Sequence, residues 1–234
     1  MPLTSGELAP LFARADEALA ACPPLADARR LTDACLAEVL LQRRLVSLAF
    51  TPFYDLLIDA LESPTARLVC RQILREEYPD PAGNSPSHRE LLVADLVALG
   101  VDRAVLLRAR PTGATLAAIA GSFELVAAAL EAPWPELALV STAACYGELL
   151  VAAEYRALTP RVEAALGPEG SAFYGPHLIH DSGHAKRLLA EVALRINPTD
   201  PSQLAACTDA IQRCLRVKLA FYEQFSHLPG RHTP

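Results

Sequence analysis

The sequence has little glycine and no surplus of basic residues. Glycine supplies 11 of the 234 residues, and 21 Lys and Arg are outnumbered by 27 Asp and Glu. A formal net charge of −6 leaves no basic surface of the kind that neutralises a phosphate backbone, so nucleic acid is not an expected partner. A chain of this length with 52% hydrophobic residues can bury a sizeable core, which excludes disorder of the whole chain.

Two further absences concern cysteines and long apolar runs. None of the six cysteines belongs to a Cys-x-x-Cys pair, which argues against a zinc ribbon or a redox dithiol. The N-terminus lacks the basic-then-apolar signature of a secretory signal. The most apolar stretches are interrupted by Glu124 and Glu148, short of the roughly 18 apolar residues that a spanning helix needs. We therefore expect a cytoplasmic protein without a membrane span.

The abundant residues indicate helices. Apolar positions recur at intervals of three and four, which predicts an all-α fold, most simply one domain over residues 1–234. Because proline removes a backbone donor and clashes with the preceding turn, the 19 prolines mark helix ends and divide the chain into about seven or eight helices. The expected breaks fall at Pro23-Pro24, Pro52, Pro64, Pro79 to Pro86, Pro111, Pro133 to Pro135, Pro160, Pro168 and Pro198 to Pro201.

Two of these boundaries carry specific signals. Ser87 and Glu90 form the pattern of a capping box, which places His88 in the first turn of a helix. Residues 197–201 close one long helix, and Ser202 opens the last one, which we expect to run to about residue 225. These two helices are expected to pack against each other in antiparallel orientation.

Three of the six histidines lie within eight residues, on a segment with apolar flanks. On a helix, His177, Asp181 and His184 point within about 60° of one another, which makes half of a metal site. Imidazole with carboxylate suits iron, manganese or zinc, and two histidines with one carboxylate favour iron(II). His180 lies about 60° off this direction and is expected to be a neighbour. A buried hydrogen-bond network is the alternative interpretation.

Two other segments present acids amid apolar sequence. One carries Glu76 and Glu77, followed by His88, and the other carries Glu148 and Glu154. Ligands from three segments are about what two metal ions need in a helical bundle. The ferritin-like version of such a site is disfavoured, because no Glu-x-x-His motif occurs in the chain.

The order of these residues resembles that of the haem-oxygenase-like diiron oxidases over about residues 70–190, which we take as the metal-site core. The resemblance implies a haem-oxygenase-like helical bundle with two Fe(II) per chain, which uses dioxygen to oxidise a small metabolite. An amino acid is the expected substrate, with desaturation or other C–H oxidation, C–C cleavage or N-oxygenation as outcomes. By this resemblance one iron is held by Glu76, His88 and Glu148, and the other by His177, Asp181 and His184.

Several choices stay open. The proline-rich loop before His88 is longer than in the family, which leaves Glu76 and Glu77 as alternatives. Family spacing to His177 favours Glu148 over Glu154, which we interpret as an acid at the surface or behind the ligands. Lys218 falls on the core face of the last helix. There it either pairs with the substrate carboxylate or with an acidic metal ligand, or extends its ammonium group to solvent.

Two other functions compete with the oxidase. A thiaminase-like hydrolase on the same scaffold would use Cys145 as its nucleophile, although the sequence shows no dedicated base beside it. A helical metal-binding protein without catalytic activity is the third alternative. In each enzymatic case the partner is a small molecule, and the protein acts alone or as a homodimer.

Overall fold

The computed structural model describes residues 5–80, 82, 85–167, 170–197 and 199–228, with the side chains of residues 5–7 and 176–182 outside the description. The described residues contain helices and no strands, which confirms the all-α prediction. The α-helices are α1 (Ser5–Ala20), α2 (Pro23–Ala26), α3 (Asp33–Ser47), α4 (Phe50–Ala60), α5 (Pro64–Glu76), α6 (His88–Ala98), α7 (Arg103–Arg108), α8 (Gly113–Leu130), α9 (Pro135–Thr142), α10 (Leu150–Leu166), α11 (Tyr174–Arg195) and α12 (Pro201–Glu223). A short 3₁₀ helix, η1 (Ala28–Arg30), follows α2, and a π-helix, η2 (Ala143–Leu149), joins α9 to α10.

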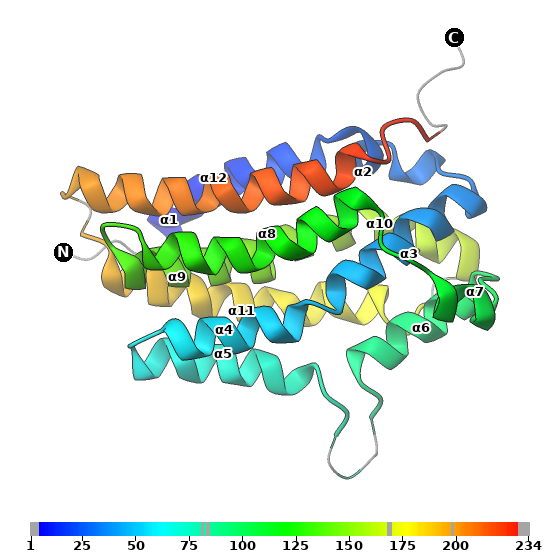
Figure 1. The fold of residues 1–234 in the computed structure, drawn as a ribbon, viewed down its shortest axis with the longest axis horizontal. Helices are drawn as coiled ribbons and strands as arrows, with labels where there is room; N and C mark the ends of the chain where they lie inside the picture. The colour runs from blue at the N-terminus through cyan, green and yellow to red at the C-terminus, as the bar shows by residue number, and fades with distance from the viewer. Residues whose placement is uncertain (1–4, 81, 83–84, 168–169, 198, 229–234) are drawn as a thin grey trace.

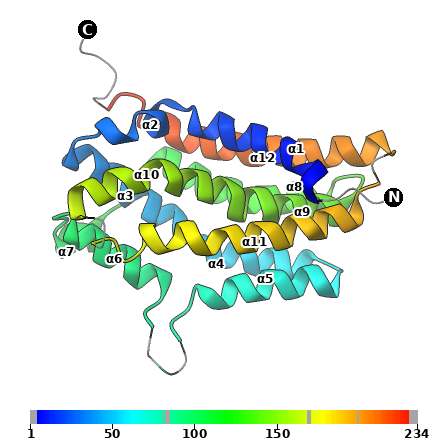
Figure 2. The same ribbon diagram turned by 180° about the vertical axis from the view of Figure 1, so that it is seen from behind.

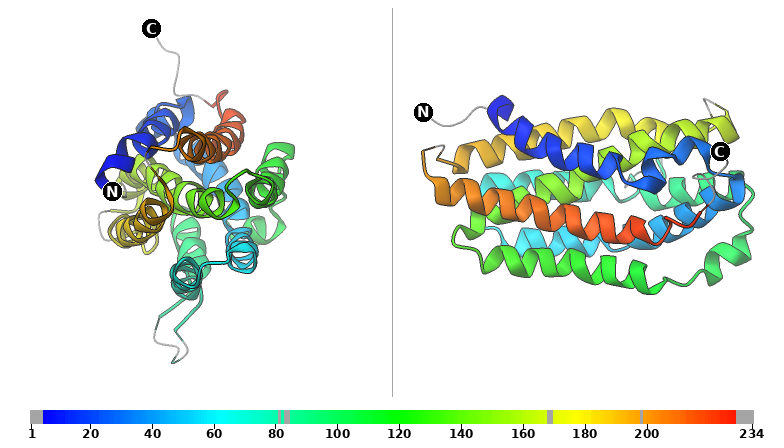
Figure 3. Two further views of the ribbon diagram at one scale, coloured as in Figure 1. Left: turned by 90° about the vertical axis from the view of Figure 1, so that its left-hand side faces the viewer. Right: turned by 90° about the horizontal axis from the view of Figure 1, so that it is seen from above.

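Most helices lie along the long axis of the molecule (Figure 1). The centre is one continuous rod, Pro135–Leu166, formed by α9, η2 and α10. Helix α12 packs on α8, α9 and α1, whereas α11 packs on α10, η2, α9, α1 and α5. The end-on view shows α11 and α12 around the middle of the bundle (Figure 3). The prediction that the last two helices pack against each other is therefore wrong, because each of them packs on the apolar rod instead.

The central rod is buried because it is apolar on all sides. In its most apolar stretch 83% of the residues are buried, as expected for a core helix. Helix α8 is also long and apolar enough to cross a membrane. It contains Glu124, and 39% of its residues are buried within the bundle. Length and composition of these two helices are weak evidence for a span, and the absence of one stays a prediction.

The helix boundaries follow the sequence at most of the expected positions. Ser87 and Glu90 form the capping box, and α6 begins at His88, as predicted. Helix α12 begins one residue before Ser202, with the side chain of Asp200 as its cap. The break expected at Pro160 is wrong, because α10 continues through this residue. A proline inside a helix removes one backbone hydrogen bond, and full burial of Leu158 and Val162 on either side offsets that loss.

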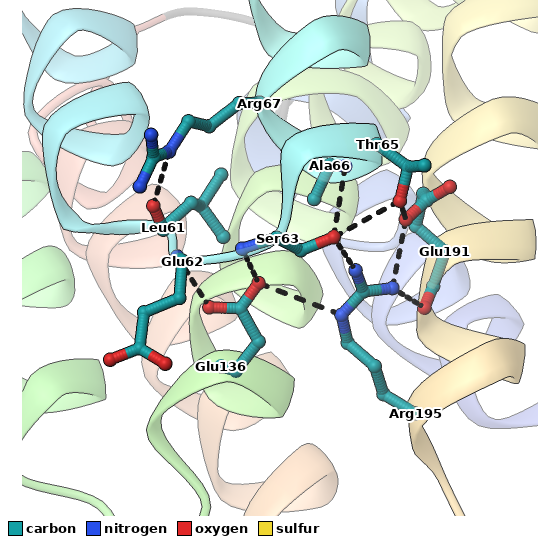
Figure 4. Close-up of polar contacts among 9 residues, drawn as sticks. All are labelled: Leu61, Glu62, Ser63, Thr65, Ala66, Arg67, Glu136, Glu191 and Arg195. Carbon is teal, nitrogen blue, oxygen red and sulfur yellow. Dashed lines mark hydrogen bonds and ion pairs between the residues drawn. The ribbon is translucent and has the colours of Figure 1, made fainter.

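A polar cluster connects three helices (Figure 4). The Glu136 carboxylate, in the first turn of α9, accepts hydrogen bonds from the backbone amides of Glu62 and Ser63 at 2.9 and 3.1 Å. Arg195, in the last turn of α11, pairs with Glu191 at 2.8 Å and also contacts Glu136 and the Ser63 hydroxyl. This clamp ties the start of α5, the start of α9 and the end of α11.

Replacing Arg195 by Met should lower the free energy of unfolding by about 1–3 kcal/mol, because the substitution removes charge-assisted hydrogen bonds from a half-buried cluster. Urea unfolding followed by circular dichroism measures the change. Arg213→Met is the matched control, since among the described residues Arg213 pairs with Asp209 alone, on an exposed helix face, and should contribute little. Equal destabilisation by the two substitutions would argue against the clamp.

Candidate metal centre

Glu148 is a buried acid in the interior of the bundle, with 3% of the residue exposed. It lies on the π-helix η2, whose wider turns are common at functional sites. The Tyr54 hydroxyl of α4 donates a hydrogen bond to its Oε1 at 2.5 Å. Its other oxygen, Oε2, lies 3.4 Å from Nδ1 of His184. A carboxylate buried in this way needs such partners, because unpaired burial of a charge is costly.

His184, on α11, lies between two carboxylates. Its Nε2 is 3.0 Å from Oε2 of Glu76, at the end of α5, while Nδ1 faces Glu148. Figure 2 shows α11 and α5 on the same side of the bundle. Both ring nitrogens are therefore in ion-pair geometry, and the carboxylates of two different helices converge on one imidazole.

A second acid–histidine pair lies at the same cleft. Nδ1 of His88, in the first turn of α6, is 2.9 Å from Oε1 of Glu77, the residue that caps α5. The two consecutive glutamates thus have different histidine partners, Glu76 with His184 and Glu77 with His88. Glu77, His88, Glu148 and His184 all line one cleft of about 50 Å³, whose other walls include Phe50, Ile73, Leu92, Val151 and Phe173.

Burial and charge shift the pKa values of this cluster. Burial raises the pKa of Glu148, and its hydrogen bonds with His184 and Tyr54 only partly oppose the effect. Burial opposes protonation of His184, but Glu148 and Glu76 outweigh it and raise the histidine pKa above its ordinary value. The pair therefore retains a proton that a metal ion could replace.

The structure brings some of the predicted ligands together, and it does not describe the side chains of the others. Glu76 and Glu148 each contact His184, and His88 lines the cleft with Glu77, Glu148 and His184. The backbone of His177, His180 and Asp181 belongs to α11, but their side chains lie outside the described residues. Among the side chains that are described, no group of three or more His, Cys, Asp or Glu is arranged as a metal-binding cluster.

Glu154 and Lys218 form a separate buried group. Glu154 is fully buried, so its interpretation as a surface acid is wrong. Lys218 is 3% exposed, which excludes extension to solvent. Its Nζ lies 2.9 Å from Oε1 of Glu154, and Nε of Arg43 lies 2.8 Å from Oε2. Glu148 and Glu154 thus serve different clusters.

Cys145 is a core residue with 1% exposure. Its thiol lies 3.9 Å from the backbone oxygen of Ile211, and burial raises its pKa well above the ordinary value. A nucleophilic cysteine needs the opposite shift. Cys145 is also not among the residues that line the cleft.

Sequence reasoning missed three residues that support the site. Tyr54 holds Glu148, and Arg43 lines the cleft. Asp95, 1% exposed, accepts hydrogen bonds from the Ser171 hydroxyl and from the backbone amides of Ala172 and Phe173 at 2.7–3.2 Å. Asp95 thereby fixes the segment that leads into α11. In each case the sequence shows a polar residue within an apolar helical pattern, which indicates that the side chain points inward. The pattern does not indicate which residue that side chain contacts.

Comparison with known proteins identifies the family. The model of a family described as iron-containing redox enzymes matches residues 37–219, which include every predicted metal ligand and Lys218. The chain belongs to this iron-containing redox enzyme family. The match confirms the resemblance inferred from the sequence, while two irons and dioxygen stay predictions. No curated protein has a sequence that matches this chain.

Solved structures show how this member of the iron-containing redox enzyme family is folded. A CADD-like protein from Nostoc punctiforme superposes with a TM-score of 0.72 at 16% identity, over 94% of this chain and 97% of that one. A domain with a heme oxygenase-like fold from Shewanella denitrificans gives 0.70 at 15% identity, over 99% of both chains. A TenA family transcription regulator from Silicibacter gives 0.60 at 16% identity, over 96% and 97%. These likenesses confirm the haem-oxygenase-like fold.

The described residues fit iron by their donor chemistry. Carboxylate oxygens and imidazole nitrogens are ligands that iron(II) accepts. Glu148 and His184 are buried potential metal ligands that form an ion pair with each other. Glu77 and His88 add a further oxygen and nitrogen on the wall of the cleft. These candidate ligands are thus already close to one another through the Glu148–His184 and Glu77–His88 ion pairs.

Gly147→Ala should destabilise the protein, because a Cβ at this position would collide with the Tyr54 hydroxyl and lie 3.0 Å from Cζ of its ring. We expect a loss of about 1–3 kcal/mol in the free energy of unfolding, measured by urea denaturation. Gly183→Ala on α11 is the control, since outside its own helix backbone no atom of the described residues lies within 4 Å of its added Cβ, and alanine is the better helix former. A Gly147→Ala protein as stable as the control would show that the close approach of Tyr54 is not required.

Proposed function

We propose that this protein is an iron(II)-dependent oxidase that uses dioxygen to oxidise a small metabolite, with an amino acid as the expected substrate. The observation that carries the proposal is the contact of His184 with both Glu76 and Glu148, together with the Glu77–His88 pair, which lines the same cleft as Glu148 and His184. Membership of the iron-containing redox enzyme family supports the choice of metal.

Two irons are proposed, with ligands from α5, α6, η2 and α11. His88 and Glu148 would hold one iron together with Glu77 or Glu76. His177, Asp181 and His184 would hold the other. Glu77 is favoured for the first iron by its 2.9 Å contact with His88, whereas Glu76 is turned towards His184. Bound iron(II) would supply the electrons with which dioxygen is reduced.

The protein's own residues prepare the cleft for this chemistry. Tyr54 fixes the orientation of the Glu148 carboxylate through its hydrogen bond to Oε1. Phe50, Ile73 and Phe173 are apolar walls of the cleft and limit the access of water to it. A cleft of about 50 Å³ has room for only a few water molecules, which favours a small substrate.

The hydrolase alternative lacks support in the described residues. The buried thiol of Cys145 has a raised pKa and does not line the cleft. The likeness to a TenA family protein concerns the fold alone, at 16% identity.

The decisive experiment is anaerobic loading of the purified chain with iron(II), followed by metal analysis and an oxygen pulse in the presence of a panel of amino acids. His184→Ala should bind less iron and lose iron-dependent oxygen consumption. Its helical content should change little, since loss of one buried side chain costs only a few kcal/mol. Wild-type iron content and oxygen consumption in the variant would remove His184 from the site.

Cys145→Ala separates the oxidase from the hydrolase. If Cys145 only packs in the core, the variant should retain iron binding and substrate-dependent oxygen consumption. The expected cost is about 1 kcal/mol of stability, since one buried sulfur is removed. A variant that folds, binds iron and yet is inactive would instead support a chemical role for the thiol.

A further inference from the structure

Two buried cations share one buried carboxylate between α3, α10 and α12. Nε of Arg43 is 2.8 Å from Oε2 of Glu154, and Nζ of Lys218 is 2.9 Å from its Oε1. The three side chains are 5%, 0% and 4% exposed. Within the described part of the chain, neither cation pairs with a second carboxylate. With all three groups ionised, this triad carries one excess positive charge away from solvent.

The surroundings of the triad are aromatic and do not neutralise the excess charge. Nζ of Lys218 lies 4.7 Å from the ring centre of Tyr146, and the Arg43 guanidinium lies 5.5 Å from that of Tyr155. Cation–π contacts of this kind stabilise a cation but leave its charge in place. Because a buried charge is costly until an opposite charge pairs with it, the triad can accept an anion.

Only one of the two cations lines the candidate centre. Arg43 is on the wall of the cleft that also includes Glu148 and His184. Lys218 lines a separate cavity of about 20 Å³, on whose wall Arg43 also lies. Arg43 therefore lines both cavities, whereas Lys218 lines only the second.

The Arg43 guanidinium also retains donor capacity. Its contact with Glu154 uses Nε, and its Nη2 contact with the Tyr155 hydroxyl is long at 3.5 Å. A guanidinium carries five N–H donors in a planar fork that matches a carboxylate. Glu154 can thus orient the fork without occupying all of it.

We infer that Arg43 binds the carboxylate of the substrate, an inference that rests on the proposed oxidase function for the identity of this cleft. Glu154 orients the guanidinium, and Lys218 offsets the charge of Glu154, so that Arg43 remains attractive to an anion. Lys218 is then a positioning residue and not the direct partner expected from the sequence. A carboxylate suits the cleft better than a phosphate dianion, since Glu77 and Glu148 on its walls repel the higher charge.

The test measures binding of the full chain to the twenty common amino acids and to their matched primary amides, which lack the carboxylate. Calorimetry on the metal-free and the anaerobic iron(II)-loaded protein reports binding without turnover. The wild type should bind at least one acid more tightly than its amide. Arg43→Met should weaken binding of that acid by about tenfold or more, the usual effect of losing a charge-assisted hydrogen bond, and leave binding of the amide nearly unchanged.

Arg89→Met is the matched control, because Arg89 lines the same cleft but its guanidinium is hydrogen-bonded to Thr51 at 2.6 Å. It should retain the preference for the acid. The inference is overturned if the wild type shows no such preference, if Arg43→Met keeps it, or if Arg89→Met loses it equally.

Arg43→Met leaves Glu154 paired with Lys218, which limits the damage to the fold. If it nevertheless fails to fold, Lys218→Met provides the second measurement. The remaining one-to-one pair of Arg43 and Glu154 should bind the acid several-fold more weakly. An unchanged preference in that variant counts against the inference. Arg43-dependent acid binding by a protein that loads iron but consumes no oxygen would refute the proposed oxidase and leave the carboxylate site intact.

Discussion

The burial of one carboxylate, that of Glu148, is the constraint on which the centre of this bundle depends. A charged group in the middle of an apolar rod is stable only with close partners, and these come from two other helices, as Tyr54 and His184. The π-helix and the absence of a side chain at Gly147 provide the space in which Tyr54 approaches. Local backbone geometry and long-range packing are thus coupled at this residue.

Behind this acidic cluster lies a basic one. Glu148, Glu77 and Arg43 line the cleft, whereas Lys218 lines a separate cavity that it shares with Arg43. Iron would neutralise the first cluster, and an anion would neutralise the second. A molecule with a carboxylate at one end would therefore meet both charge requirements of a single cleft, with its remaining atoms directed to the acidic side.

The sequence predicted those features that depend on local pattern. The all-α class, the capping box at Ser87 and the inward acid at Glu148 all follow from helical periodicity and from the cost of burying charge. The π-helix, the Tyr54 partner and the pairing of α11 with the central rod depend on contacts between distant segments. Pro160 shows the same limit, because tertiary burial overrides a strong local signal there.

The clamp of Figure 4 and the candidate centre draw on the same three helical segments, α5, the rod of α9 and η2, and α11. The chain covers about 11 to 13 residues from Ser63 to Glu76, from Glu136 to Glu148 and from Arg195 to His184, which in the two α-helical segments, the first and the last, is roughly 16–20 Å of rise. The three segments that connect the clamp to the candidate ligands are thus of nearly equal length. A one-residue insertion in any of these segments would rotate its ligand by about 100° about the helix axis. The loop between Glu77 and His88 lies outside the three segments, so a change in its length would not rotate these ligands.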